Sequence, residues 1–315
     1  MQEKEKIDLN TISANEIDLH ELIKVLFYSK LLISFITSLA LIFAVIYSLS
    51  LPNIYQSKAL LTPNDLDNTS NSLKSYSGLA SIAGISLPSQ MGQNNAAVAL
   101  KKLNSYSFFK ENILPNINLT DLMAVKSWNP VNNSIILDKD IYDDNSNKWV
   151  RDFNYPQTLV PSAQESFKKF KKDHLRISED SDTSFVTITI EHQSPYIAKA
   201  WNELMVYEIN KFYREKDKTE AEKATDYLNE KIANTNFAEI KEVIAVLLQQ
   251  ETQKLTLIEA KESYIYEYID PPSVMEEKFQ PNRALICLVF TFMGVILGVL
   301  ISLIRHYWFL KREKQ

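Results

Sequence analysis

Glycine is scarce in this chain of 315 residues, which contains only five: Gly78, Gly84, Gly92, Gly294 and Gly298. No two of them are separated by a single residue, so the dinucleotide-binding pattern G-x-G-x-x-G does not occur. The only G-x-x-x-G joins the last two, and neither Lys-Ser nor Lys-Thr follows it. The usual dinucleotide and P-loop nucleotide sites are therefore excluded.

Cysteine and histidine are rarer still. Cys287 is the only cysteine, so the chain can form neither an internal disulfide nor a cysteine zinc cluster. The four histidines do not form H-E-x-x-H, and G-x-S-x-G is absent. The aspartates at 138–144 lack the glycine of an EF-hand loop, so we interpret them as a solvated loop. We predict no catalytic, metal-binding or cofactor-binding residue, and a protein that is not an enzyme.

Basic residues are also fewer than acidic ones, 34 against 39. The net charge is −5 and the pI is near 5.6, whereas sequence-independent binding of nucleic acid needs a basic surface. We therefore expect no nucleic-acid partner.

Two long uncharged runs stand out against this background. Residues 31–51 and 284–304 each contain 21 residues without a charge. At about 1.5 Å per residue, each is long enough to cross a bilayer core of roughly 30 Å. The first run is longer than the ~7–15 apolar residues of a signal peptide, and no A-x-A site follows it, so we favour an uncleaved anchor.

The distribution of Lys and Arg predicts the orientation of the two spans. Four lysines lie in residues 1–30 and four Lys or Arg in residues 305–315, whereas only Lys58, Lys278 and Arg283 flank the spans on the other side. We expect a cytoplasmic arm (1–30), a first span (31–51), a periplasmic part (52–283), a second span (284–304) and a cytoplasmic tail (305–315).

Alternation of apolar and polar residues predicts strands in the periplasmic part. The pattern is clear at 54–62, 184–191 and 264–269, and a shorter strand is expected at 175–178. The first strand follows span one and the last precedes span two. A sheet made from these strands would form a membrane-proximal base, which gives an α+β fold class.

A long helical region lies between the third and fourth strands. Ser194-Pro195 is a start signal, and a break at 234–236 divides the apolar pattern into helices of about 39 and 26 residues, which predicts a hairpin over about 195–262. Its second helix carries apolar residues that are candidates for packing, within one chain or between neighbouring copies: Ile240, Ile244, Leu247 and Leu255.

Two other stretches are polar. Residues 63–93 are rich in Ser, Asn and Gly around an apolar piece at 78–87, and we interpret them as a partly ordered loop, with a mobile segment facing a cavity or another subunit as the alternative. Residues 128–161 are predicted to be irregular.

The join to the second span has a distinctive pattern. Prolines fix φ and remove donors, so Pro271, Pro272 and Pro281 predict an extended, stiff connector. Gly294 and Gly298 then permit close approach of another helix. Together they resemble the proline/glycine motif P-x2-P-x4-S-P-K-x11-G-x3-G of Wzz-type polysaccharide co-polymerases, the chain-length determinants.

Pro272 and Pro281 match the first and third prolines of that motif, and the glycines have its spacing, whereas Met275, Gln280 and Asn282 depart from it. The segment 17–22 (IDLHEL) is similar to the family's I-D-L-x-E-L, and GISLP at 84–88 and VTITIEHQSP at 186–195 are also similar.

The resemblance implies a periplasmic α/β base that carries a long helical hairpin, and a ring-like homo-oligomer in the inner membrane. It implies partnership with the O-antigen polymerase and lipid-linked glycan, and control of the modal length of lipopolysaccharide O antigen or a related surface glycan. The tail of 11 residues has no Walker motif, which is typical of the kinase-free type.

Three other functions compete with this interpretation. A membrane-anchored periplasmic adaptor or scaffold of a glycan export system would also use a long hairpin. A two-span sensor would need a cytoplasmic signalling domain, which neither terminal segment can hold. A glycan enzyme would need a carboxylate or histidine constellation that the sequence does not show.

Overall fold

The computed structural model describes residues 19–64, 95–261 and 263–313. The chain divides into two compact units, which we describe separately. The first contains the described residues up to Pro52 and those from Pro281 onward, and the second extends from Asn53 to Gln280. The motif at 84–88, the apolar piece at 78–87 and the start of the motif at 17–22 lie outside the described residues.

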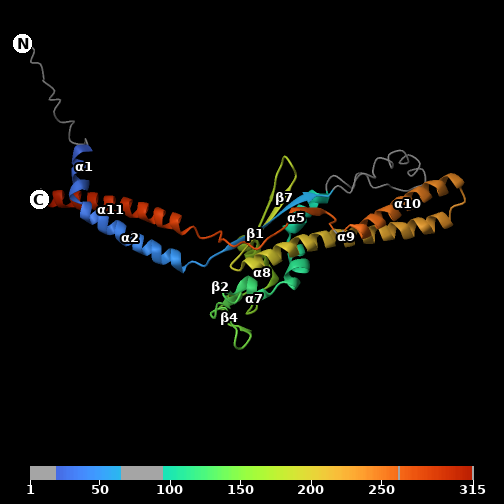
Figure 1. The fold of residues 1–315 in the computed structure, drawn as a ribbon, viewed down its shortest axis with the longest axis horizontal. Coiled ribbons are helices and arrows are strands. Elements are labelled where there is room, and N and C mark those ends of the chain that lie inside the picture. The colour runs from blue at the N-terminus through green and yellow to red at the C-terminus, as the bar shows by residue number, and fades with distance from the viewer. Residues whose placement is uncertain (1–18, 65–94, 262, 314–315) are drawn as a thin grey trace, which may run out of the picture. The chain divides into compact units, whose positions relative to one another are not determined.

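Three helices form the first unit: α1 (Leu19–Tyr28), α2 (Lys30–Ser50) and α11 (Arg283–Glu313). α2 and α11 pack side by side in antiparallel orientation (Figure 1), and α1 contacts α11. Both uncharged runs are therefore helical. Only 11% of the most apolar window of each helix is buried within the protein, whereas a core helix of a soluble protein would be mostly buried. Their length and exposed apolar surface suit a lipid environment.

The second unit is built on a four-stranded antiparallel sheet with the order β6-β7-β1-β8. Its strands are β1 (Tyr55–Pro63), β6 (Leu175–Glu179), β7 (Val186–His192) and β8 (Tyr266–Asp270). All four predicted strands are confirmed, and they join one sheet.

β7 and β8 each begin two residues later than predicted, for local reasons. Ser184 has φ 58°, a left-handed conformation that no strand residue adopts, so β7 begins at Val186. Before β8, the backbone N–H groups of Tyr264 and Ile265 donate to the side chain of Asn210 instead of to a neighbouring strand.

The long helix α9 (Pro195–Ala233) packs on the sheet through β1 and β7. It begins as predicted, because Ser194 Oγ accepts from the N–H of Ile197 and proline occupies the first turn. Alternate residues of β1 and β7 point into the core beneath it, and the side chains of α9 complete that core: Ala59, Leu61, Ile188, Ile190, Trp201, Met205 and Ile209.

α9 continues beyond the sheet and forms a hairpin with α10 (Ala238–Ala260). The two helices lie side by side (Figure 1). α10 has 23 residues, fewer than the 26 predicted. Taken with α2 and α11, the sheet and hairpin confirm the predicted fold class: an α+β unit with a long helical hairpin and two flanking apolar helices.

Shorter elements complete the second unit. Helical segments lie between residues 95 and 174 and flank α9, and they contribute a cluster of aromatic side chains to the core, including Phe108, Phe109 and Phe170. Their bounds are α5 (Asn95–Leu103), α6 (Tyr106–Phe108), η3 (Phe109–Ile113), η4 (Leu114–Asn116), α7 (Leu119–Met123), α8 (Ala163–Lys169) and the π-helical turn η5 (Phe170–His174).

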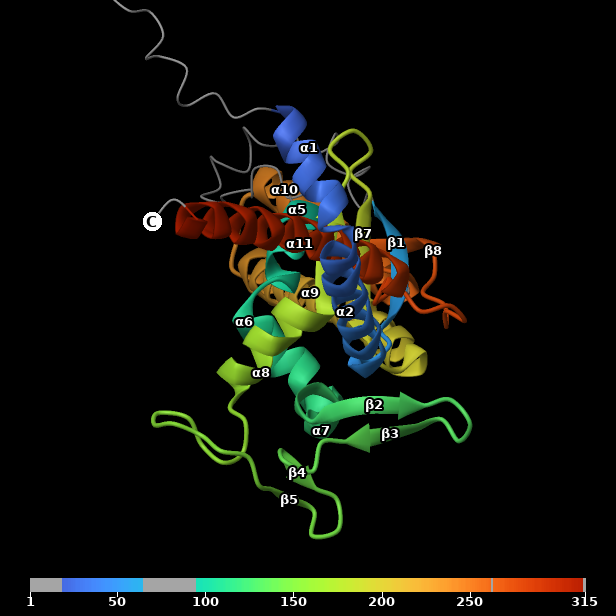
Figure 2. The same cartoon turned by 90° about the vertical axis from the view of Figure 1, so that its left-hand side faces the viewer.

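The stretch 128–161 is more regular than predicted. It contains most of the hairpin β2 (Val125–Asn129) and β3 (Ser134–Leu137), and a second hairpin of β4 (Tyr142–Asp143) and β5 (Lys148–Trp149), which Figure 2 shows beside α7 and α8. Asn133 and Asn147 take the positive φ that tight turns require, at 49° and 52°. Tyr142 and Trp149 pair edge to face across the second hairpin, 5.1 Å between ring centroids.

Candidate functional site

Gly294 and Gly298 lie where α11 closely approaches α2. A Cβ at Gly294 would lie 2.7 Å from Ala40 Cβ and 3.2 Å from Thr37 Cα, and one at Gly298 would lie 3.1 Å from Ile33 Cα. Distances this short require either helix to move. Both positions therefore depend on the missing side chain, as in other small-residue helix contacts.

Small residues extend this contact along both helices. Ala44 and Ser48 of α2 and Ser302 of α11 are almost completely buried, and they continue the spacing of the glycines at intervals of about four residues. The Arg283 side chain donates from Nε to the Ser48 carbonyl oxygen at 3.2 Å. We call this contact the small-residue seam: Ala40, Ala44, Ser48, Gly294, Gly298 and Ser302.

The proline connector is tied to the first strand at two points. Ser57 Oγ donates to the carbonyl oxygen of Ser273 at 2.9 Å. Further on, the N–H of Ile54 donates to the Gln280 carbonyl oxygen, also at 2.9 Å, as part of an isolated bridge. Pro272 is buried, Pro271 is exposed and Pro281 is half-buried. The connector bends at 276–277. Met275, which stands where the motif has its second proline, immediately precedes this bend, and the extended, stiff connector remains a prediction.

The hairpin candidates occupy different environments. Ile244 and Leu247 are buried against Leu228 of α9, and Ile240 packs on the edge of the same cluster. Leu255 is half-buried further along α10. The structure therefore brings three of the four candidates together within one hairpin.

The aspartates at 138–144 serve the local turns. Asp138 Oδ1 accepts from the N–H of Asp140 at 3.1 Å, and Asp143 accepts from the N–H of Asn145 and the hydroxyl of Ser146. The last two hydrogen bonds lower the pKa of Asp143. Turn formation accounts for this cluster without a ligand.

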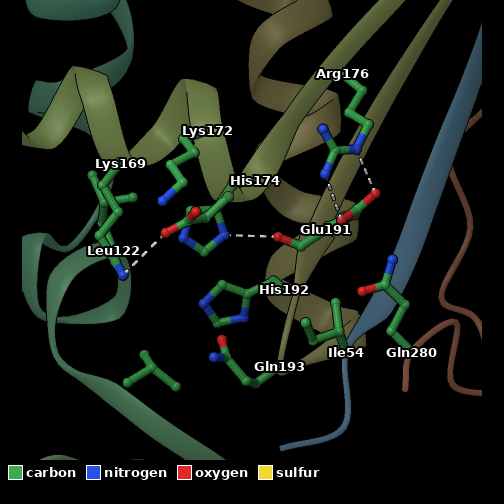
Figure 3. Close-up of a pocket in the computed structure, with 12 residues that line it drawn as sticks. Ile54, Leu122, Lys169, Lys172, His174, Arg176, Glu191, His192, Gln193 and Gln280 are labelled. Carbon is green, nitrogen blue, oxygen red and sulfur yellow. Dashed lines mark hydrogen bonds and ion pairs between the residues drawn. The ribbon is translucent and has the colours of Figure 1, made fainter. Parts of the chain in front are cut away.

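A pocket of about 290 Å³ opens at one end of the sheet, within the second unit (Figure 3). Side chains from α7, α8, η5, β2, β6 and β7 line it, together with both residues of the isolated bridge. The lining residues are Ile54, Leu122, Val125, Lys169, Lys172, Asp173, His174, Arg176, Glu191, His192, Gln193 and Gln280.

Two buried histidines form the floor of this pocket, with ring centroids 5.5 Å apart. His192 Nδ1 accepts from the N–H of Ser194, so Nε2 carries the proton and donates to the Asp121 carbonyl oxygen at 3.0 Å. His174 Nδ1 lies 2.7 Å from the Glu191 carbonyl oxygen and must be the donor there. The Nε2 of His174 therefore carries a lone pair, and it has no hydrogen-bond partner in the described part of the chain.

Burial keeps both rings neutral. Burial is the main cause that lowers the pKa of His174 to about 4, and the adjacent His192 ring lowers it further. Burial also lowers the pKa of His192. The His174 lone pair is thus present throughout the neutral pH range.

The acidic groups of the pocket are paired with cations. Glu191 is buried and accepts from Arg176 Nε at 3.0 Å, which Figure 3 shows beside the His174 contact. Asp173 accepts from Lys169 at 3.4 Å. Lys172 also lines the pocket, and it makes no ion pair with another described residue.

Neither histidine was singled out by sequence reasoning. The signal lay in strand pairing: Leu175 opposes Ile190, which places the preceding His174 next to Glu191 and His192. That register could not be read from the sequence, because β6 is short and joins β7 through a turn of irregular conformation.

Comparison with known proteins points to one family. Residues 15–122, about a third of the chain, match the family model described as "Wzz: Chain length determinant protein". This segment contains α1, α2, β1 and the helices up to α7. The search of curated proteins found no match.

Solved structures with related descriptions were also found. One is titled "full-length bacterial polysaccharide co-polymerase", with 13% identity, a TM-score of 0.40, and coverage of 92% of this chain and 98% of that one. Another is a fragment of WzzB, a polysaccharide co-polymerase from Salmonella Typhimurium, with 14% identity, a TM-score of 0.31, and coverage of 72% and 100%. Residues 15–122 are thus similar to the Wzz chain length determinant proteins, the family that the motifs of this sequence resemble.

Proposed function

We propose that this protein sets the modal length of lipopolysaccharide O antigen, or of a related surface glycan, together with the inner-membrane polymerase. The observation that carries the proposal is the match of residues 15–122 to the chain length determinant family. We propose further that the protein acts without catalysing a reaction.

The two apolar helices support a two-span topology. Their exposed apolar surfaces suit lipid, and the seam that joins them lacks the side chains that would hold them apart. With the Lys and Arg distribution, this supports spans at 31–51 and 284–304, cytoplasmic termini, and a periplasmic part from 52 to 283.

The mechanism we propose is scaffolding by a ring of copies. The sheet would form the base of each copy, and the hairpins would present a surface to the polymerase, to lipid-linked glycan, or to both. The α9–α10 hairpin supports this role because most of α9 beyond the sheet packs only on α10 in the described structure, which leaves its outer faces free for other molecules.

Deletion of the gene tests the function directly. The O-antigen ladder is expected to change from a band of preferred length to an unregulated distribution, while polymer is still made. The intact chain supplied from a plasmid should restore the preferred length. Complete loss of surface polymer would instead support an export adaptor, and an unchanged ladder would exclude the proposed role.

A further inference from the structure

The pocket beside His174 has an unmet hydrogen-bonding requirement. His174 is only 6% exposed, and its Nε2 is an acceptor that no described residue satisfies. A buried acceptor without a donor costs roughly 1–3 kcal/mol, so such groups are usually satisfied by water or a ligand. What binds at Nε2 must donate a hydrogen bond, because the lone pair repels an oxygen without a proton.

The charges of the pocket point to the second property of the ligand. Arg176 and Lys169 are already paired with Glu191 and Asp173. Lys172 remains as the uncompensated charge of the lining, and Lys168 and Lys171 precede it on the same helical segment. A ligand that carries an anionic group would therefore be attracted to this side of the pocket.

The volume of the pocket and its other lining groups further limit the class of ligand. A volume of about 290 Å³ lies at the lower limit of ordinary ligand pockets, which suits one ring-sized unit. The amides of Gln193 and Gln280 supply both donors and acceptors at the wall, as Figure 3 shows. Hydroxyl groups can donate and accept, so a ligand with several of them matches this lining.

We propose that this pocket binds one acidic sugar unit, with a hydroxyl that donates to His174 Nε2 and a carboxylate or phosphate that pairs with Lys172. Nε2 is shielded from solvent, so lining side chains must move when the sugar enters. The proposal rests on the proposed function for the source of the sugar, which is either an acidic residue of the glycan or the sugar phosphate of its lipid carrier. The binding test is independent of that function.

Titration calorimetry on the full chain in lipid nanodiscs tests the site. The probes are glucuronic acid, glucose 1-phosphate, glucose, acetate and inorganic phosphate. We expect at least one acidic sugar to bind roughly tenfold or more tightly than glucose, because a hydrogen bond to a charged group is worth about that factor. Tighter binding of glucuronic acid assigns the site to the glycan, and tighter binding of glucose 1-phosphate assigns it to the carrier.

Three variants locate the contacts. Lys172→Ala should abolish the preference for the acidic sugar over glucose, whereas Lys168→Ala, an exposed lysine outside the pocket, should retain it. His174→Phe should weaken the binding of acidic and neutral sugars alike. If His174→Phe fails to fold, Lys172→Ala still tests the proposal. That variant should fold, because Lys172 is exposed and makes no ion pair in the described structure.

Three results would overturn the proposal: no saturable binding of either acidic sugar, binding of phosphate or acetate as tight as that of the sugars, or an acidic preference that survives Lys172→Ala. If deletion of the gene still abolishes the preferred glycan length, any of these results would reject the pocket and leave the proposed function standing.

Discussion

The side chain of Asn210 in α9 is hydrogen-bonded to the backbone at the start of β8. Removal of this side chain gives the sharpest test of the fold. Its Oδ1 accepts from three consecutive backbone N–H groups, those of Tyr264 at 3.1 Å, Ile265 at 2.7 Å and Tyr266 at 2.9 Å. Its Nδ2 donates to the Tyr266 carbonyl oxygen at 3.0 Å. The residue is only 7% exposed. One side chain thus takes the place of a neighbouring strand for three residues.

Asn210→Ala would leave these four backbone groups without partners. Each buried unsatisfied group costs about 1–3 kcal/mol, and water that enters the vacated space reduces the total. We expect a loss of about 3–6 kcal/mol in the free energy of unfolding. This is a large fraction of the ~5–15 kcal/mol that stabilises an ordinary domain.

Asn229→Ala is the matched control. Asn229 lies on the same helix and is exposed, so it experiences the same change in helix propensity without loss of a buried hydrogen bond. Urea unfolding of the full chain in detergent measures the stability. Hydrogen exchange at 264–266 measures the local effect, and 3 kcal/mol corresponds to about 100-fold faster exchange. Unchanged exchange at these three amides in Asn210→Ala would refute the reasoning.

Three further predictions concern the seam, the hairpin and the histidines. Gly294→Leu combined with Gly298→Leu should lower the melting temperature in detergent and alter the glycan ladder, because the added side chains would collide with the α2 backbone. Val295→Leu on the exposed face should change neither the melting temperature nor the ladder. Equal melting temperatures would show that the small-residue seam tolerates larger side chains. Leu247→Asp should remove hydrogen-exchange protection from the hairpin, because it buries a carboxylate beside Leu228. Leu257→Asp at an exposed site should leave the protection intact. Protection that persists in Leu247→Asp would contradict the observed packing. The folded-state pKa of His174 lies below its ordinary value of 6.5, so the unfolded chain binds more protons and stability should fall as pH decreases from 6.5 towards 4. A decline of about 2–3 kcal/mol by pH 4.5, measured from urea midpoints, should be smaller in His174→Phe, and identical pH profiles would exclude this histidine as the cause.

The parts of the fold that sequence predicted are those with a strong period. Val186, Ile188 and Ile190 alternate with polar residues, and the structure buries all three under α9. Ser194 and Pro195 together specify the start of a helix whatever surrounds them. The uncharged runs are long enough to determine their own conformation. In each case the signal is local and repeated.

The missed features depend on contacts between distant residues. The side chain of Asn210, which lies 54 residues before Tyr264, shortens β8, and no sequence pattern near Tyr264 predicts this contact. The hairpins β2–β3 and β4–β5 have only two to five residues in each strand, too few for a period to be seen. The pocket combines residues from both ends of the second unit, Ile54 and Gln280, with two histidines brought together by strand pairing.

The packing of the hairpin also narrows where a neighbouring copy could bind. Ile244 and Leu247 are already buried within their own hairpin, so they are not available to another chain unless the hairpin opens. The large apolar side chains that remain exposed near the far end of the hairpin include Tyr227, Phe237 and Leu257. A substitution at Leu247 that dissociated an oligomer could therefore act by unfolding the hairpin, whereas the same result at Leu257 would locate the contact between copies.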